Sequence, residues 1–371
     1  AMGLWGATAG VATIAGPLIK DKLFFMVSAE RNTDPRPLSI ATLNQIPGYN
    51  QGVLDEVINI ANTQRYGGYA TGDFVTINNQ KDEKIVGKID WNITDNHRLS
   101  LSYINAYEES TVANGTSANN NTPVIGLASN YYQSSNLLRA GIVKLNSDWT
   151  DQLSTEARFL YRSTRRGQDP LLGTGYPQIR VCTDPTSIVN GTNTASSCGV
   201  GTPIVAFGPD NSRQANELFF DTWGGSFLTR YSAGSHELKF LVEYNENRSR
   251  NLFVQNATGS LYFDSITDFR NGRASAYNLQ VALDGDINSA AADFKYGQYT
   301  FGFQDDWAIT DRLTLTYGAR YDLYGMRTQV PLNSFYLARY GFPNTKTFKG
   351  MDNFQPRISA NWQTNDWLSL R

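Results

Sequence analysis

The two cysteines are the residues best placed to form a covalent link in this chain. Cys182 and Cys198 are the only cysteines, and the stretch between them is rich in Gly, Ser, Thr and Asn. In an oxidising compartment such a pair is expected to form a disulfide that pins an external loop, and two free thiols are the alternative. The disulfide would restrict an unfolded loop of about fifteen residues by about 3 kcal/mol. With no histidine nearby, the pair does not indicate a metal site.

Other residues with ligand-like spacing do not predict a metal or catalytic site. The segment Asp284–Asn288 has the Asp-x-Asp-x-Asn spacing of a calcium loop, but position twelve is Lys295, where a bidentate Glu is needed. We therefore interpret it as a solvated turn. His97 and His236 lie in two different turns, and neither has a Cys or His at ligand spacing. No nucleophile elbow, Walker loop, zincin or dinucleotide motif is present. The sequence predicts no enzyme, no metal and no cofactor.

The composition excludes further classes of protein. With 32 Lys+Arg against 34 Asp+Glu, the chain lacks the basic excess of a nucleic-acid binder. Its mean hydropathy is −0.39, and no segment approaches the ~18 consecutive apolar residues of a membrane-spanning helix. An aromatic content of 12% argues against an intrinsically disordered chain. A β-barrel with alternating polar and apolar faces fits all of these values.

Strict alternation of apolar and polar residues predicts paired strands. Residues 313–323 place Leu, Tyr and Ala on one face and Thr, Gly, Arg and Asp on the other. Residues 299–309 alternate in the same way, although Asp305 interrupts their apolar face and has no explanation in the sequence. Strands of about eleven residues, tilted by ~45°, would each cross roughly 26 Å.

Short turns and long connections alternate along the chain. The turns contain Thr-Asp or Thr-Asn pairs, or Gly-Ser, and the Thr and Asp side chains can bond local backbone N–H groups. The predicted turns lie at residues 93–99, 149–153, 232–236, 308–313 and 362–367. The long connections run approximately over residues 108–137, 164–217, 248–295 and 325–355. Short turns at one end and long loops at the other are typical of an antiparallel transmembrane β-barrel.

The aromatic residues are sorted by strand end. Tyrosines lie toward the long loops, and tryptophans lie near the short turns; both ring types favour the headgroup level of a membrane. The tryptophans expected at the membrane interface are Trp91, Trp149, Trp307, Trp362 and Trp367. A soluble β-sandwich or barrel is the alternative, but it would not need this sorting.

Three stretches, in order, resemble TonB-dependent outer-membrane receptors of the Oar-like type. Ala15–Phe25 (AGPLIKDKLFF), followed by Glu30–Arg31, is similar to the junction between plug and barrel in that family. Gln304–Trp307 (QDDW) and Leu313–Asp322 (LTLTYGARYD) resemble a hairpin in the middle of the barrel. Phe354–Ser359 (FQPRIS) resembles the opening of the strand that follows.

The resemblance implies a barrel of about 22 strands that is closed by a plug domain. Residues 1–20 would be the tail of the plug and its junction with the barrel, and residues 21–371 would be the N-terminal half of the barrel, with about eleven strands. The chain would be a piece of a longer protein in the bacterial outer membrane. Its partners would be outer-membrane lipid, its own plug, an extracellular ligand and the TonB–ExbB–ExbD complex, and it would bind no nucleic acid.

The function implied by the resemblance is TonB-dependent import of a bulky substrate, such as a peptide, a glycan or a metal chelate. A structural or adhesive surface barrel and a passive porin are the alternatives. Substrate would be captured by the long loops, where Tyr131, Tyr132, Arg165 and Arg166 are the candidate contacts, although the two tyrosines could equally begin a strand at the membrane interface. Inward positions would face the plug, touch substrate or pair with one another: Lys88, Asp90, Arg158, Arg162, Lys239, Glu243, Arg320 and Asp322.

Overall fold

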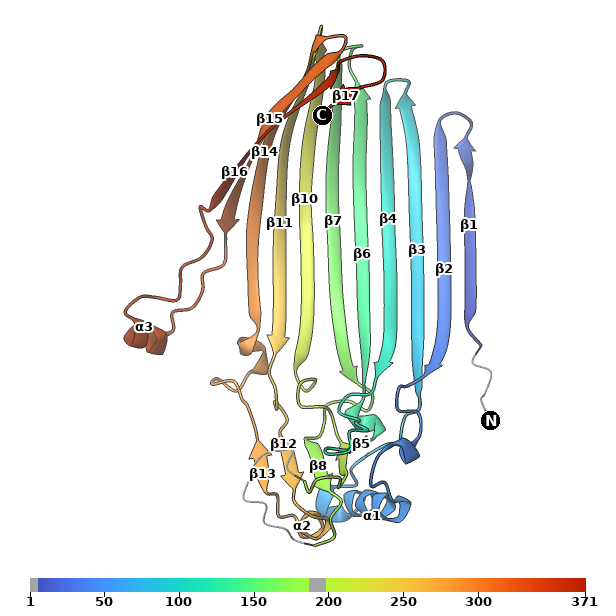
Figure 1. Ribbon diagram of the computed structural model, residues 1–371, viewed down its shortest axis with the longest axis vertical. Coiled ribbons are helices and arrows are strands. Elements are labelled where there is room, and N and C mark those ends of the chain that lie inside the picture. Colours follow the sequence, from blue (N-terminus) through green and yellow to red (C-terminus); the bar gives the residue numbers. More distant parts are fainter. Residues whose placement is uncertain (1–5, 187–197) are drawn as a thin grey trace.

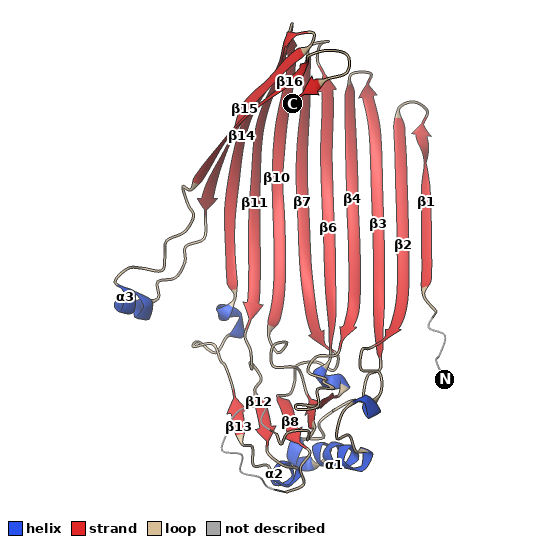
Figure 2. Ribbon diagram, viewed as in Figure 1, coloured by secondary structure: helices blue, strands red, loops and turns tan. Residues whose placement is uncertain are grey.

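One large antiparallel sheet dominates the computed structural model, which describes residues 6–186 and 198–371 (Figures 1 and 2). The sheet has 12 strands that lie side by side almost in chain order. These strands are β1 (Thr8–Ile19), β2 (Leu23–Pro37), β3 (Ile77–Thr94), β4 (His97–Val112), β6 (Tyr132–Asp148), β7 (Leu153–Pro170), β10 (Asn216–Ala233), β11 (His236–Phe253), β14 (Ala292–Thr310), β15 (Leu313–Met326), β16 (Asp352–Gln363) and β17 (Ser369–Leu370). Within the described residues, no helix is long and apolar enough to cross a membrane.

The short turns form where the sequence predicted them and lie together at one end of the sheet, the upper end in Figure 1. Their side chains bond the local backbone as expected. Thr150 Oγ1 accepts hydrogen bonds from the backbone N–H groups of Gln152 and Leu153 at 3.2 and 3.0 Å. Asn365 Oδ1 accepts from two backbone N–H groups of the last turn in the same way. The predicted all-β antiparallel architecture is confirmed.

Residues 1–20, which the sequence analysis assigned to the plug tail and its junction with the barrel, include a strand of the large sheet. Residues 8–19 form β1, which pairs with β2 from Thr8 opposite Thr33 to Ile19 opposite Leu23. The hairpin closes because Asp21 adopts the left-handed conformation, at φ 57°, which Asp tolerates better than most residues. This pairing makes the segment part of the sheet.

The strands are longer than the predicted eleven residues. β3, β7, β10 and β11 each have 18 residues, and β14 has 19. The prediction ended each strand where the apolar alternation stops. Backbone pairing does not need apolar side chains, so the strands continue past the apolar band as polar ribbons.

Beyond the far end of the large sheet lies a second unit, which we call the cap (Figure 1). It contains a five-stranded sheet with the order β13-β12-β8-β9-β5, and the helices α1 and α2. Its elements are β5 (Val124–Gly126), β8 (Gln178–Cys182), β9 (Ile204–Phe207), β12 (Ser260–Phe263), β13 (Ala276–Asn278), α1 (Gln51–Ala61) and α2 (Ile266–Asn271). A third helix, α3 (Ser334–Tyr340), projects from the connection between β15 and β16, away from the cap.

The hydrophobic core of the described chain sits in the cap. Val57 of α1, Phe207 of β9 and Phe269 of α2 are fully buried and belong to one apolar cluster. This cluster draws on four long connections, including residues 38–76, which the sequence analysis did not recognise as a long connection. Three of the four predicted long connections therefore fold into a packed domain together with residues 38–76, because apolar residues spaced far apart in sequence meet there. The fourth, residues 325–355, which the structure describes in full, contributes no residue to this cluster.

Candidate functional site

One face of the large sheet carries an apolar band. On β11 the residues Leu238, Phe240, Val242 and Tyr244 alternate on this face, and the side chain of Val242 is 52% exposed. Glu246 follows on the same face beyond the band. From the first residue of β11 to Tyr244, the strand covers roughly 20–25 Å at a tilt of ~40°, which matches the apolar band of an outer-membrane barrel. This is the outward, lipid-facing side.

Aromatic rings lie at both borders of the band. Trp91, Trp149, Trp362 and Trp367 are exposed near the short turns. Trp307 lies at the same end and stacks on a histidine of the next strand. Tyr103, Tyr161 and Tyr299 are exposed toward the long connections, whereas the exposed Tyr231 lies near a short turn. Their contact with lipid headgroups stays a prediction.

The opposite, inward face is polar, and several of its charges pair with one another. Lys88 Nζ lies 2.8 Å from Asp90, and Lys239 Nζ lies 2.8 Å from Asp306. Three further predicted inward residues also have side-chain partners on this face. Arg320 Nε donates to Asp322 at 3.0 Å, and Arg162 donates to Thr222 at 3.3 Å. Mutual pairing, one of the alternatives for these residues, therefore accounts for much of this face.

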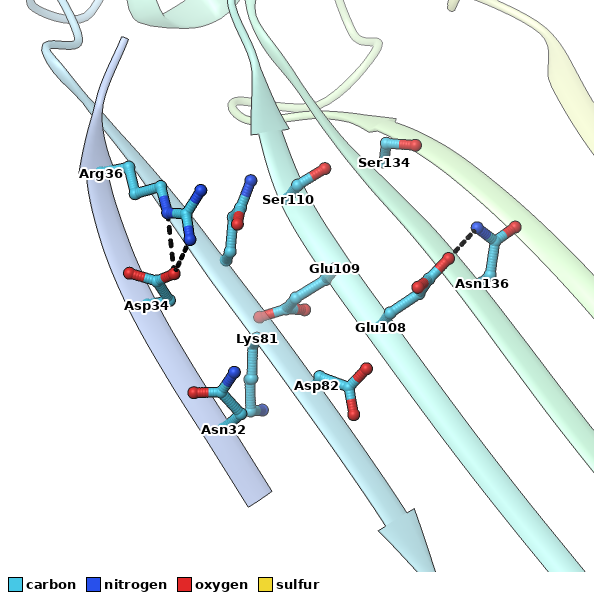
Figure 3. Close-up of a pocket in the computed structure, with 11 residues that line it drawn as sticks. Asn32, Asp34, Arg36, Lys81, Asp82, Glu108, Glu109, Ser110, Ser134 and Asn136 are labelled. Carbon is cyan, nitrogen blue, oxygen red and sulfur yellow. Dashed lines mark hydrogen bonds and ion pairs between the residues drawn. The ribbon is translucent and has the colours of Figure 1, made fainter. Parts of the chain in front are cut away.

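A polar pocket of about 400 Å³ opens at the cap end of β2, β3, β4 and β6 (Figure 3). We call it the mouth pocket. Asp34 accepts a hydrogen bond from Arg36 Nε at 2.7 Å, and Glu108 accepts one from Asn136 at 2.7 Å. The remaining lining residues are Asn32, Gln80, Lys81, Asp82, Glu109, Ser110 and Ser134.

The mouth pocket carries more acceptors than donors. Asp82 and Glu108 are directly opposite each other on β3 and β4, an arrangement in which like charges repel. Lys84 offsets part of this charge, with its Nζ 2.8 Å from Asp82. The pocket is therefore suited to groups that donate hydrogen bonds or carry positive charge.

Tyr132, the first residue of β6, contacts the base of the cap. Its hydroxyl accepts a hydrogen bond from Arg213 Nη2 at 2.9 Å, and the guanidinium lies 4.3 Å from the centroid of its ring. Arg213 Nη1 also pairs with Asp210 at 2.8 Å. Nearby, burial lowers the pKa of the Arg180 guanidinium, an effect that Tyr262 and Asp210 oppose. Tyr132 thus holds the cap against the strand end.

Tyr131, its neighbour, is a packing residue in this structure. It is 0% exposed, and its hydroxyl shares a hydrogen bond with Thr116 Oγ1 at 2.9 Å. Burial raises the pKa of its phenol. The sequence analysis proposed it as a substrate contact because it adjoins a long loop. Its position in the sequence could not show that the folded loop covers the ring completely.

Arg165 and Arg166 point to opposite faces of β7, as neighbours in a strand must. The guanidinium of Arg165 lies 4.8 Å from the centroid of the Phe219 ring. Arg166 is opposite Asn136, which lines the mouth pocket, and paired residues share a face. The two arginines therefore cannot grip one ligand together, and Arg166 is the one on the inward face.

The remaining candidate groups have structural surroundings. Cys182 and Cys198 form a disulfide in the cap, with their Cα atoms 5.6 Å apart. Asp284 Oδ1 accepts from the Asp286 backbone N–H at 3.0 Å and from Ser289 Oγ at 2.9 Å, so this segment is an internally bonded turn. These bonds lower the pKa of the Asp284 carboxyl. Across residues 6–186 and 198–371, no three metal-ligating side chains come together.

Comparison with known families identifies one match. The family described as "Outer membrane beta barrel domain" matches residues 34–371. A search of curated protein sequences finds no match.

Solved structures with a similar fold include outer-membrane transporters. The outer membrane transporter YddB from Escherichia coli is 11% identical, with a TM-score of 0.57 over 96% of this chain and 36% of that one. The FrpB iron transporter from Neisseria meningitidis, F3-3 variant, is 14% identical, with a TM-score of 0.52 over 98% and 43%. P. aeruginosa FpvA, bound to a heterologous pyoverdine and iron, is 11% identical, with a TM-score of 0.52 over 98% and 39%. The chain therefore spans less than half the length of each of these three proteins.

Proposed function

Because the chain belongs to the outer membrane beta barrel domain family, we propose that it is the first part of a TonB-dependent receptor that imports a bulky substrate. Its place in the bacterial outer membrane agrees with the prediction from the sequence. The short turns then face the periplasm, and the cap faces the outside.

The observation that carries this proposal is the polar mouth pocket beneath a folded cap. A substrate path needs an inward face whose polar side chains can change partners and bind the substrate, and an outer binding surface held by a rigid scaffold. The ion pairs of the inward face provide such side chains. The packed core of the cap provides the rigid outer surface. The likeness in fold to receptors and transporters, such as FrpB and FpvA, agrees with this function.

In the proposed mechanism, substrate binds first at the cap and the outer connections. It then passes the mouth pocket, where Glu108 and Asp82 accept hydrogen bonds, and descends along the inward face. A plug domain that precedes β1 closes this path until TonB, driven by ExbB and ExbD, rearranges it. In this mechanism the residues that the structure describes bind and pass the substrate without a covalent step. A peptide, a glycan or a metal chelate remains the substrate class.

An uptake experiment tests the coupling. Cells that express the full-length receptor are given a labelled ferric chelate, a peptide and an oligosaccharide, with TonB present or deleted. We expect uptake of one probe that stops without TonB or with a protonophore. Flux that persists in both conditions selects the passive porin, and surface binding without uptake selects the adhesive barrel.

Two adjacent arginines provide a matched pair of variants for the same assay. Arg166→Ala removes a cation beside the mouth pocket, whereas Arg165→Ala removes one from the outward face. We expect uptake to fall only in the first variant. Equal uptake in both variants would remove Arg166 from the proposed path.

A further inference from the structure

Asp305 places a carboxylate in apolar surroundings, where burial of a charge has a high cost in free energy. It stands on the outward face of β14, between Phe303 and Trp307 in the alternation, and its side chain is 1% exposed. An ionisable group within the apolar band of a membrane protein is rarely kept without a partner or a function. The proposed transport path does not use Asp305, because that path runs along the other face.

Side chains from both neighbouring strands converge on Asp305. His236 Nδ1, from β11, lies 2.7 Å from Asp305 Oδ2, and Tyr317 donates from its hydroxyl to the same oxygen at 2.7 Å. The ring of Trp307 stacks on His236, with centroids 5.3 Å apart and an interplanar angle of 14°. We call these four residues the Asp305 cluster.

The arrangement occupies only one ring nitrogen of His236. A ring that donates through Nδ1 to a carboxylate keeps Nε2 for another partner, and within the described residues no side chain or backbone group bonds it. The side chain of His236 is 37% exposed. When both ring nitrogens carry a proton, Nδ1 donates to Asp305 and Nε2 is free to donate a second hydrogen bond.

The depth of the Asp305 cluster in the membrane indicates which chemical group contacts His236 Nε2. His236 is the first residue of β11, next to a periplasmic turn, and it stacks on Trp307, a ring type that marks the headgroup level. The groups at this depth that accept a hydrogen bond are lipid phosphates. Along β11, the exposed side chains of Phe240 and Val242 continue as an apolar surface for acyl chains.

We propose that the Asp305 cluster is a binding site for a phospholipid of the periplasmic leaflet, with His236 Nε2–H donating to the headgroup phosphate. Asp305, which accepts a hydrogen bond from Tyr317, positions the imidazole through Nδ1, and stacking on Trp307 fixes the orientation of the ring. A soluble phosphate would lack the acyl chains that Phe240 and Val242 contact. The alternative is that a second copy of the chain binds this face, and the test distinguishes this dimer from a bound lipid.

The chain contains a matched control. His97 is the first residue of β4 and also follows a periplasmic turn. It contacts Trp149, with ring centroids 5.0 Å apart, but no carboxylate within the described chain pairs with it. A general effect of histidine at the interface would therefore appear at both positions, and a site built on Asp305 would appear only at His236.

Native mass spectrometry of the full-length receptor in detergent tests the proposal, with dioleoyl phosphatidylglycerol as the probe. We expect His236→Gln to weaken lipid retention about fivefold, the equivalent of about 1 kcal/mol for one hydrogen bond. His97→Gln is expected to retain lipid as the unmodified protein does. Dioleoylglycerol, which lacks phosphate, and inorganic phosphate, which lacks acyl chains, are both expected to bind more weakly.

A second measurement uses the unmodified protein, so it does not depend on a variant that folds. Phosphatidylglycerol is expected to protect His236, but not His97, from modification by diethyl pyrocarbonate, as read by peptide mass spectrometry. Equal protection of the two histidines would overturn the proposal. So would equal retention of dioleoylglycerol, or protection of His236 that follows dimer formation in the absence of lipid.

Discussion

Truncating Phe269 should open the cap while the large sheet stays folded. The Phe269 ring is 0% exposed, stacks on Tyr66 with centroids 4.6 Å apart, and contacts Phe263 edge to face at 5.1 Å. Replacing a buried Phe by Ala removes these contacts and leaves a cavity, at a typical cost of 3–5 kcal/mol. The cap has its own core, whereas the sheet is held by strand pairing, so the loss should remain in the cap.

Hydrogen exchange of the full-length protein in detergent measures this effect. For Phe269→Ala, a loss of about 4 kcal/mol corresponds to opening that is roughly 10³ times more frequent, so the amides of α1, β8 and β9 should exchange far faster. Amides in the middle of β6 and β7 should keep their protection. Phe335→Ala is the matched control, because Phe335 of α3 is 85% exposed and its removal leaves no cavity.

Two results would refute this reasoning. If β6 and β7 lose protection together with the cap, the two units unfold as one, and the cap is not independently packed. If the amides of the cap keep their protection in Phe269→Ala, the cluster around this ring does not hold the cap together.

Further predictions concern the cap and its junction with the barrel. Burial raises the pKa of Tyr66 to about 12; because this value exceeds the ~10 of an unfolded tyrosine, the stabilisation is complete below pH 10 and is lost as the pH rises through 12. The difference in absorbance at 295 nm between the unmodified protein and Tyr66→Phe should therefore change in that window, together with the near-ultraviolet circular dichroism, and a Tyr66 difference signal near pH 10 with an intact cap would contradict it. Replacing Cys182 and Cys198 by Ser should lower cap stability by about 3 kcal/mol, as measured by proteolysis of the cap, and labelling of both thiols in unreduced protein would show that the bond is absent. Arg213→Ala should remove the contact with Tyr132 and raise hydrogen exchange at the start of β6. Arg213→Lys should restore part of the protection through its charge. Identical exchange in all three proteins would show that this contact does not hold the cap against the strand end.

The strand period and the turn chemistry were predictable because both are local. Side chains alternate along any strand, so residues 313–323 reveal two faces without knowledge of the neighbouring strands. Thr150 bonds backbone groups only two and three residues away, and this turn was identified from its residues alone. Strand ends were less predictable, because backbone pairing continues where the apolar pattern has stopped.

The cap was not predictable in the same way. Its core joins Val57, Phe207 and Phe269 from three separate connections. The segment of Val57 has the apolar spacing of an amphipathic helix, which the sequence analysis missed, whereas β9 and α2, with four and six residues, are too short to show a pattern. The same limit applied to Tyr131, which the sequence placed beside a loop and the folded cap encloses. β1 was assigned to a plug from a family likeness, but its pairing with β2 is set by contacts that the likeness did not describe.

What the sequence by itself determined is the barrel: its alternating faces, its turns, the sorting of its aromatic rings and its outer-membrane location. These properties follow from interactions with lipid and with near neighbours, which act on each strand separately. Only the tertiary structure decided the cap, the mouth pocket and the role of Asp305. The carboxylate of Asp305 broke the apolar pattern without explanation until β11 and β15 brought His236 and Tyr317 to it, because cross-strand partners are set by register and not by distance along the chain.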